Sequence, residues 1–340
     1  MLLRRNAGDA LALAIEQRLF GTRVPWDKVD LELSAIGNVD TRIARLKEYL
    51  ARAPNDPAGG MRLVKLLARA GHADEALLFS RKLKAAGLLT PRLVLALGDL
   101  QADAGQTDDA IRTYSEIVEF DPRNQAARQL LGDVYLAHGW YDLAYAQYTT
   151  LTEMAPDNLL AWLRLAAAAA GAGRTDEALR IERKVARSPG NPGPSDPRLF
   201  ARLAAAAHMA RLMAQPPKDV DGKRLVESMS RDLAELQLFQ GPGTLVLLSW
   251  EDLGADLVAR TGGKSPALAG ETTDAAAVGL SALLLPAGKR GAVQLQAHLR
   301  SAPPSRPLKL MVCAIDHDGK TFQVNLKRVE LAAGQADVAL

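Results

Sequence analysis

The sequence is poor in several residue types, and each shortage narrows what the protein can be. It has a single cysteine, Cys313, so no disulfide can form within the chain and cysteine usage indicates no redox compartment. Cys313 stands in an apolar strand pattern, which predicts a buried packing residue and not a nucleophile. No apolar run approaches the roughly 18 residues that a membrane-spanning helix needs, so we expect a soluble chain without a membrane span.

An excess of charge of one sign is also lacking. Lys and Arg number 42 against 39 Asp and Glu, which leaves a formal net charge of only +3. Without a basic run, this excess is too small to indicate nucleic acid or an anionic membrane as a partner. The apolar fraction of 48% and the charged fraction of 24% are those of a folded protein. Richness in alanine, arginine and glycine favours a bacterial source, whereas the compartment, cytoplasm or cell envelope, stays open.

The motifs of catalysis and metal binding are missing as well. We find no serine, histidine and aspartate arrangement with a recognisable elbow, so we predict that the chain is not an enzyme. The GGKS sequence at 262–265 lacks the first glycine of a phosphate-binding loop, and the DHDG sequence at 316–319 predicts a tight hairpin turn. We expect no metal and no cofactor, because no two of the histidines stand four residues apart. The histidines are His72, His138, His208, His298 and His317.

What the chain does contain is a repeat of 34 residues between residues 23 and 192. Glycine, aspartate, alanine and proline each recur at this step. The four columns are Gly37, Gly71, Gly105, Gly139 and Gly173; Asp40, Asp74, Asp108, Asp142 and Asp176; Ala76, Ala110, Ala144 and Ala178; and Pro54, Pro122 and Pro156. A shared period of this length indicates stacked helical hairpins, here of a first helix A and a second helix B.

The columns have physical reasons. We expect the glycine to end helix A in the left-handed conformation, and the aspartate three residues later to cap helix B by accepting backbone N–H bonds. Small residues such as Gly98 and Gly132 let the two helices approach closely, and an aromatic such as Tyr114 or Tyr148 fills the space beside the crossing. Proline stops helix B.

The repeat resembles the tetratricopeptide repeat family, whose pattern has small residues at positions 8 and 20, an aromatic at 24 and proline at 32. Residues that match positions 8 and 24 are Gly98, Gly132 and Ala166, and Tyr114 and Tyr148. The alanine and proline columns match positions 20 and 32. The resemblance covers about half of the chain and implies a right-handed superhelical α-α solenoid that binds a protein or peptide partner.

We therefore expect four parts. Residues 1–22 form an N-terminal capping helix, and residues 23–192 form about five repeats, of which the first is divergent. Residues 193–240 contain a proline-rich linker and two further helices, at about 198–214 and 221–239. From residue 241 the pattern alternates, and six short strands separated by Gly, Pro and Asp turns predict a small all-β sandwich of residues 241–340. The six strands are expected at 244–250, 255–260, 277–285, 292–299, 308–315 and 321–331.

The last part resembles the YfaP-type bacterial β-domain, through the LVLLSWED and GADLVAR segments at 245–252 and 254–260 and the late LKLMVCAI, DHDG and FQVNLKRVEL segments. The resemblance implies an envelope setting. Members of that family tend to carry additional aspartates in the second strand. Here Asp256 remains, but Val258 stands where another aspartate is expected, so we predict no cation site from the resemblance.

The same repeat family places partner contacts at positions 2, 5, 6, 9, 12 and 13 of helix A. The residues at such positions are Arg62, Lys65, Arg69, Arg92, Asp99, Asp103, Gln129, Asp133 and Arg164. Their charge changes sign along the chain, from basic in the early repeat to acidic in the next two. Aspartate at 99 and 133, where asparagine would be needed, argues against a client held by its terminal carboxylate.

We predict a non-catalytic interaction scaffold that binds a peptide or protein on its helix A surface, with the β-domain as a second contact. An alternative is a cell-envelope or carbohydrate-binding protein in which the β-domain recognises the ligand and the repeats are a spacer. A third class is a hydrolase or regulatory subunit that acts through a partner. The client and the oligomeric state stay open.

Overall fold

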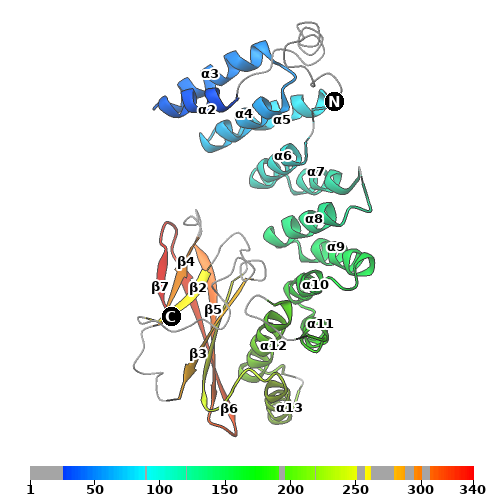
Figure 1. Ribbon diagram of the computed structural model, residues 1–340, viewed down its shortest axis with the longest axis vertical. Coiled ribbons are helices and arrows are strands. Elements are labelled where there is room, and N and C mark those ends of the chain that lie inside the picture. Colours follow the sequence, from blue (N-terminus) through cyan, green and yellow to red (C-terminus); the bar gives the residue numbers. More distant parts are fainter. Residues whose placement is uncertain are drawn as a thin grey trace. The chain divides into compact units, whose positions relative to one another are not determined.

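The computed structural model describes residues 26–88, 90–119, 121–190, 196–218, 220–250, 257–261, 279–287, 295–300 and 307–340. The predicted capping helix of residues 1–22, Asp256 and the GGKS sequence lie outside this part. The chain divides into two compact units, Met1–Asn124 and Gln125–Leu340, and each is described by itself. The described residues form twelve helices followed by seven strands (Figure 1).

The described residues of the first unit form three helical hairpins. Their helices are α2 (Trp26–Ala35), α3 (Val39–Arg52), α4 (Pro57–Arg69), α5 (Ala73–Ala85), α6 (Pro91–Asp103) and α7 (Thr107–Glu119). The even-numbered helices α2, α4 and α6 are helix A of the first three repeats. Leu46, Leu67, Leu83 and Leu97, from α3, α4, α5 and α6, belong to one buried cluster. The divergent first repeat is therefore packed into the same core as the others.

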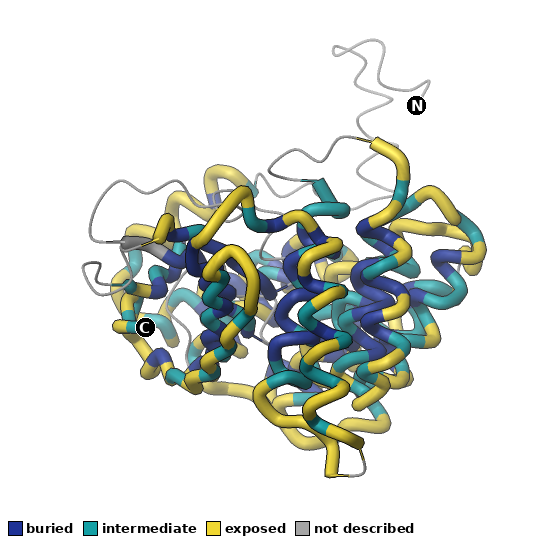
Figure 2. The backbone as a smooth tube through the Cα atoms, turned by 90° about the horizontal axis from the view of Figure 1, so that it is seen from below, coloured by how far each residue is buried: buried dark blue, intermediate teal, exposed yellow. Residues whose placement is uncertain are grey.

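The second unit begins with two more hairpins, which two further helices follow. These helices are α8 (Gln125–Ala137), α9 (Tyr141–Met154), α10 (Leu159–Gly171), α11 (Thr175–Ala186), α12 (Pro197–Ala214) and α13 (Gly222–Glu235). The helix expected at 221–239 ends four residues early, because Gln237 adopts a positive φ of 54° that cannot continue a helix. Buried and exposed residues alternate along the helices, as the tube in Figure 2 shows.

The turn glycines act as expected in four of the five repeats. Gly71, Gly105, Gly139 and Gly173 have φ between 71° and 83°, the left-handed region. The residue after each glycine donates to a carbonyl five residues back, as in the bond of His72 N to Leu67 O at 3.0 Å, so helix A ends in a Schellman turn. Gly37 does not adopt positive φ, so the expectation is wrong for the divergent first repeat.

The expected aspartate caps of helix B are wrong. The aspartate column, from Asp40 to Asp176, lies inside the first turn of α3, α5, α7, α9 and α11. Among the described residues none of these carboxylates accepts a backbone N–H. The Schellman turn leaves the residue after the glycine as N-cap, for example His72, and so places Asp74 two residues inside the helix. At that position the negative carboxylate still interacts favourably with the positive, N-terminal end of the helix dipole.

The small and aromatic columns pack against each other as the sequence predicts. A Cβ added to Gly132 would lie 2.8 Å from Tyr148 Cζ, and one added to Gly98 would lie 2.3 Å from Tyr114 Cε1. Both tyrosines are fully buried. Helices A and B of these repeats can therefore approach only because the side chain at position 8 is absent.

The strands form two antiparallel sheets. One has the order β3-β1-β5-β6 and the other the order β2-β4-β7. Their strands are β1 (Gly243–Trp250), β2 (Leu257–Thr261), β3 (Leu280–Pro286), β4 (Leu295–Leu299), β5 (Leu308–His317), β6 (Phe322–Leu331) and β7 (Asp337–Ala339). Six of them fall on the predicted segments, and β7 was not predicted. Residues of both sheets share one buried cluster, which includes Val246, Leu257, Leu283 and Ala297.

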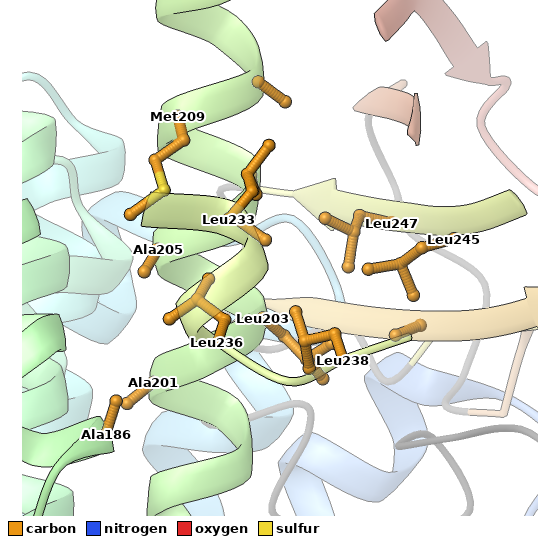
Figure 3. Close-up of a cluster of buried hydrophobic side chains, with 14 of the residues drawn as sticks. Ala186, Ala201, Leu203, Ala205, Met209, Leu233, Leu236, Leu238, Leu245 and Leu247 are labelled. Carbon is orange, nitrogen blue, oxygen red and sulfur yellow. The ribbon is translucent and has the colours of Figure 1, made fainter. Parts of the chain in front are cut away.

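Strand β1 of the four-stranded sheet is buried on both faces. Val246 and Leu248 of β1 belong to the core shared with the other sheet, whereas Leu245 and Leu247 belong to a second cluster with helices α12 and α13. Figure 3 shows Leu245 and Leu247 on the side of β1 that faces the helices. Burial on both faces explains why β1 is a continuous apolar run without alternation. The last helices and the β region therefore share one hydrophobic core.

Candidate functional site

Three predicted contact residues lie on α4, and the structure gives them different surroundings. Arg62 donates from Nε and Nη2 to the two oxygens of Asp30 at 2.8 and 2.7 Å. The hydrogen bond from Arg62 lowers the pKa of Asp30. Lys65 and Arg69 are exposed and make no hydrogen bond or ion pair among the described residues. Arg62 thus ties α2 to α4, and only Lys65 and Arg69 offer unpaired charge to a partner.

Helix α6 carries the next three residues. Asp99 accepts a hydrogen bond from the Tyr114 hydroxyl at 2.5 Å. Its carboxylate therefore holds the tyrosine that fills the space beside Gly98. Arg92 and Asp103 are exposed and have no ion pair within the described part of the chain. Asp99 has an internal role, and Arg92 and Asp103 remain available.

In the second unit the structure brings Gln129, Asp133 and Arg164 together, from α8 and α10. The Tyr148 hydroxyl donates to Asp133, and Arg164 Nε lies 3.2 Å from Asp133 Oδ1. Burial raises the pKa of Asp133, although Arg164, Tyr148 and Gln129 act in the opposite direction. Burial and the neighbouring Asp133 also raise the pKa of Tyr148. We call these three residues the Gln129–Asp133–Arg164 cluster.

The hydrogen bonds that Asp99 and Asp133 accept from tyrosines inside the chain were not predicted, although the sequence contains a signal for them. Aspartate and tyrosine stand 15 residues apart at Asp99 and Tyr114, and again at Asp133 and Tyr148. In the last repeat the tyrosine position is occupied by Glu182, which is 2% exposed and pairs with His208 Nδ1 of α12 at 2.9 Å. The recurring pair marks a bond between helices A and B of one repeat, which makes both aspartates costly to change.

Asp318 and Cys313, for which the sequence predicted a turn and a packing role, have surroundings that agree with these roles. Asp318 accepts from the backbone N–H groups of Lys320 and Thr321 at 2.8 and 2.7 Å, which confirms the predicted hairpin turn. Hydrogen bonds to the carboxylate, of which the one from the Thr321 backbone N–H has the largest effect, lower the pKa of Asp318 to about 2. Cys313 is 2% exposed, as expected, and burial raises the pKa of its thiol to about 12.

A pocket of about 540 Å³ that the sequence did not indicate lies on α11 and α13. Its wall contains Arg180, Arg183, Lys184 and Arg187. Arg183 pairs with Asp232, Arg187 with Glu235 at 2.9 Å, and Arg180 with Glu177 at 3.4 Å. Lys184 lies over the Trp162 ring, 3.4 Å from its centroid. Most of the positive charge of the pocket is therefore compensated by neighbouring carboxylates.

Two other features are absent from the described residues. They contain no group of three histidine, cysteine, aspartate or glutamate side chains placed to hold a metal ion. Within the same part of the chain, no helix is long and apolar enough to cross a membrane.

Family comparisons match part of the helical region. Residues 101–157 and residues 130–192 each match a tetratricopeptide repeat model. Residues 101–192 are therefore similar to tetratricopeptide repeats. Neither match extends to the strands, so the comparisons do not support the resemblance to the YfaP-type β-domain. No curated protein matches the sequence.

Several solved structures are similar over the helices. YrrB, described as a TPR protein with an unusual peptide-binding site, is 21% identical with a TM-score of 0.36, over 52% of this chain and 91% of its own. MamA is 22% identical with a TM-score of 0.36, over 48% and 93%. The C-terminal part of a TPR repeat-containing protein from Cytophaga hutchinsonii is 16% identical with a TM-score of 0.40, over 62% and 79%.

Proposed function

We propose that the protein is a non-catalytic interaction scaffold whose helix A surfaces bind a peptide or protein partner. The observation that carries this proposal is the match of residues 101–192 to tetratricopeptide repeats. The proposal includes a right-handed superhelical solenoid followed by a β-sandwich, within the boundaries 23–192 and 241–340. Repeats of this kind stack so that variable helix positions form an extended surface.

The contacts inside the chain support a narrower set of partner-binding residues. Of the nine residues predicted from the repeat positions, Arg62, Asp99 and Asp133 make strong contacts inside the chain. In the first unit we assign partner contact to the exposed residues without an ion pair. These residues are Lys65, Arg69, Arg92 and Asp103. Charged side chains at the rim of an interface mainly set association rate and specificity, so we expect them to select a partner of complementary charge.

We further propose that the β region provides a second contact for the same partner. Support comes from the core that α12 and α13 share with β1, β3 and β5. This core fixes the sheet to the last helices of the second unit, so a partner on those helices would meet the sheet in a defined orientation. In this proposal the repeats are more than a spacer for a carbohydrate-binding sheet.

Affinity capture with the full chain tests the proposal. The bait is immobilised, partners are captured from a lysate of the source cells, and they are identified by mass spectrometry. The double variant Lys65→Glu with Arg69→Glu changes helix A of one repeat. The matched control, Lys82→Glu with Arg112→Glu, makes the same change in net charge on exposed residues of helix B.

We expect the helix A variant to lose a partner that the native chain and the control both retain. Equal capture by all three chains would contradict the assignment of the helix A surface. Capture that depends only on glycan, and is lost when soluble sugar is added, would favour the β region as the recognising part.

A further inference from the structure

Arg164 is a buried cation with two donor atoms that have no hydrogen-bond partner. The residue is only 8% exposed, and its Nε and Nη1 atoms are buried without a hydrogen-bond partner. The guanidinium also interacts with the Tyr148 hydroxyl, and Nη2 is not among the buried atoms without a partner. A guanidinium has five N–H donors, and buried donors in folded proteins almost always find acceptors. The unused donors of Arg164 therefore require an explanation.

Asp133 does not accept a hydrogen bond from these donors of Arg164. Its Oδ1 lies 3.2 Å from Arg164 Nε, close enough for an ion pair but outside hydrogen-bond geometry. The carboxylate instead accepts the hydroxyl proton of Tyr148. The side chain of Asp133 is 31% exposed and that of Arg164 is 10% exposed, so the cluster presents a carboxylate acceptor beside a guanidinium that is largely buried. Asp133 neutralises the charge of Arg164 but leaves its donors available.

This arrangement discriminates between two kinds of ligand group. A carboxylate placed on Arg164 would also lie near Asp133, and the repulsion between the two negative charges would offset the attraction of the cation. An uncharged amide meets no such opposition, because its carbonyl oxygen can accept from Arg164 while its N–H donates to Asp133. Gln129, one helical turn before Asp133, adds a further donor and acceptor.

We infer that the Gln129–Asp133–Arg164 cluster binds an amide group of an extended, uncharged peptide segment, through the backbone or an Asn or Gln side chain. The inference rests on the proposed function and states which ligand chemistry this part of the surface selects. Recognition of this kind depends on geometry more than on net charge. Binding at the cluster is therefore only weakly sensitive to salt, unlike binding of an acidic segment.

A random library of 12-residue peptides displayed against the full chain tests the inference. Enriched peptides are synthesised, and their Kd values are measured at low and high salt for the native chain and for two variants. Arg164→Lys keeps the positive charge but removes the planar fork of donors. Asp133→Asn keeps an acceptor for Tyr148 but removes the negative charge.

The expected peptides have no acidic residue at the contact, and their Kd changes little with salt. Arg164→Lys weakens their binding about tenfold or more, since a hydrogen bond to a charged group is lost. Asp133→Asn also weakens it, by a smaller factor. The inference is overturned if the enriched peptides are acidic and bind more tightly to Asp133→Asn, because that result assigns the cluster to carboxylates.

Other outcomes separate this inference from the proposed function. Peptides whose binding depends on Lys65 and Arg69 but is unchanged in both cluster variants refute the inference and leave the proposed function standing. Failure to enrich any peptide on the native chain counts against both. Gln129→Ala removes a partly exposed side chain and serves as a milder third variant if either buried substitution lowers the Tm so far that the chain unfolds.

Discussion

The packing of glycine against tyrosine gives a quantitative prediction for Gly132→Ala. Alanine is favoured over glycine in a helix interior by about 1 kcal/mol, so helix propensity alone predicts a more stable protein. The new Cβ would lie 2.8 Å from the Tyr148 ring, which is fully buried and bonded to Asp133. Overpacking of this kind costs about 1–3 kcal/mol. We therefore expect a net loss of about 1 kcal/mol in the free energy of unfolding.

The last repeat supplies a matched control for this prediction. There the small position is already alanine, Ala166, and the position of the tyrosine is occupied by the smaller Glu182. Ala166→Gly should also destabilise, by about 1 kcal/mol, because it loses helix propensity without relieving a clash. Urea unfolding followed by far-UV circular dichroism measures both changes. An increase in stability for Gly132→Ala would refute the packing argument.

Three further predictions concern buried or bonded side chains. His208→Ala should lower the free energy of unfolding by about 3–5 kcal/mol, since it leaves the buried Glu182 without its partner, and a urea midpoint unchanged from the native chain would contradict this. Cys313 should not react with a thiol reagent in the native protein, because its thiol is buried and its pKa is raised. It should react only as fast as the protein unfolds. Rapid labelling of the native protein would contradict its burial between the sheet and the helices. Because the pKa of Asp318 is lowered to about 2 from 3.8, its stabilisation of the hairpin is complete above pH 3.8 and lost as the pH falls through about 2. NMR of the Thr321 amide should report that loss, and a midpoint near pH 4 would contradict it.

The helical repeats could be predicted from the sequence because their determinants are local and periodic. The glycine turns and the glycine–tyrosine contacts recur at one step, so several columns support the same interpretation. The prediction that the aspartates cap helix B was wrong because the residue after the turn glycine, such as His72, is the N-cap. That residue moves Asp74 and its equivalents inside helix B.

The partners of the candidate site could not be predicted in the same way. The bond of Arg62 to Asp30 and the approach of Arg164 to Asp133 each join neighbouring repeats, about 30 residues apart. Such contacts depend on how the helices stack, which the repeat period does not specify. The shared core of α12, α13 and β1 was missed for a related reason, since apolar runs indicate burial without naming what covers each face.

The central claim is that partners bind on helix A, and acetylation of exposed lysines tests it most directly. Lys65 lies on helix A and Lys82 on helix B of the same repeat, and both are exposed. The full chain is treated with a lysine-specific acetylating reagent with and without its captured partner, and modification is measured by mass spectrometry. We expect the partner to slow acetylation of Lys65 several-fold while the rate at Lys82 stays the same. Protection of Lys82 with no change at Lys65 would contradict the claim.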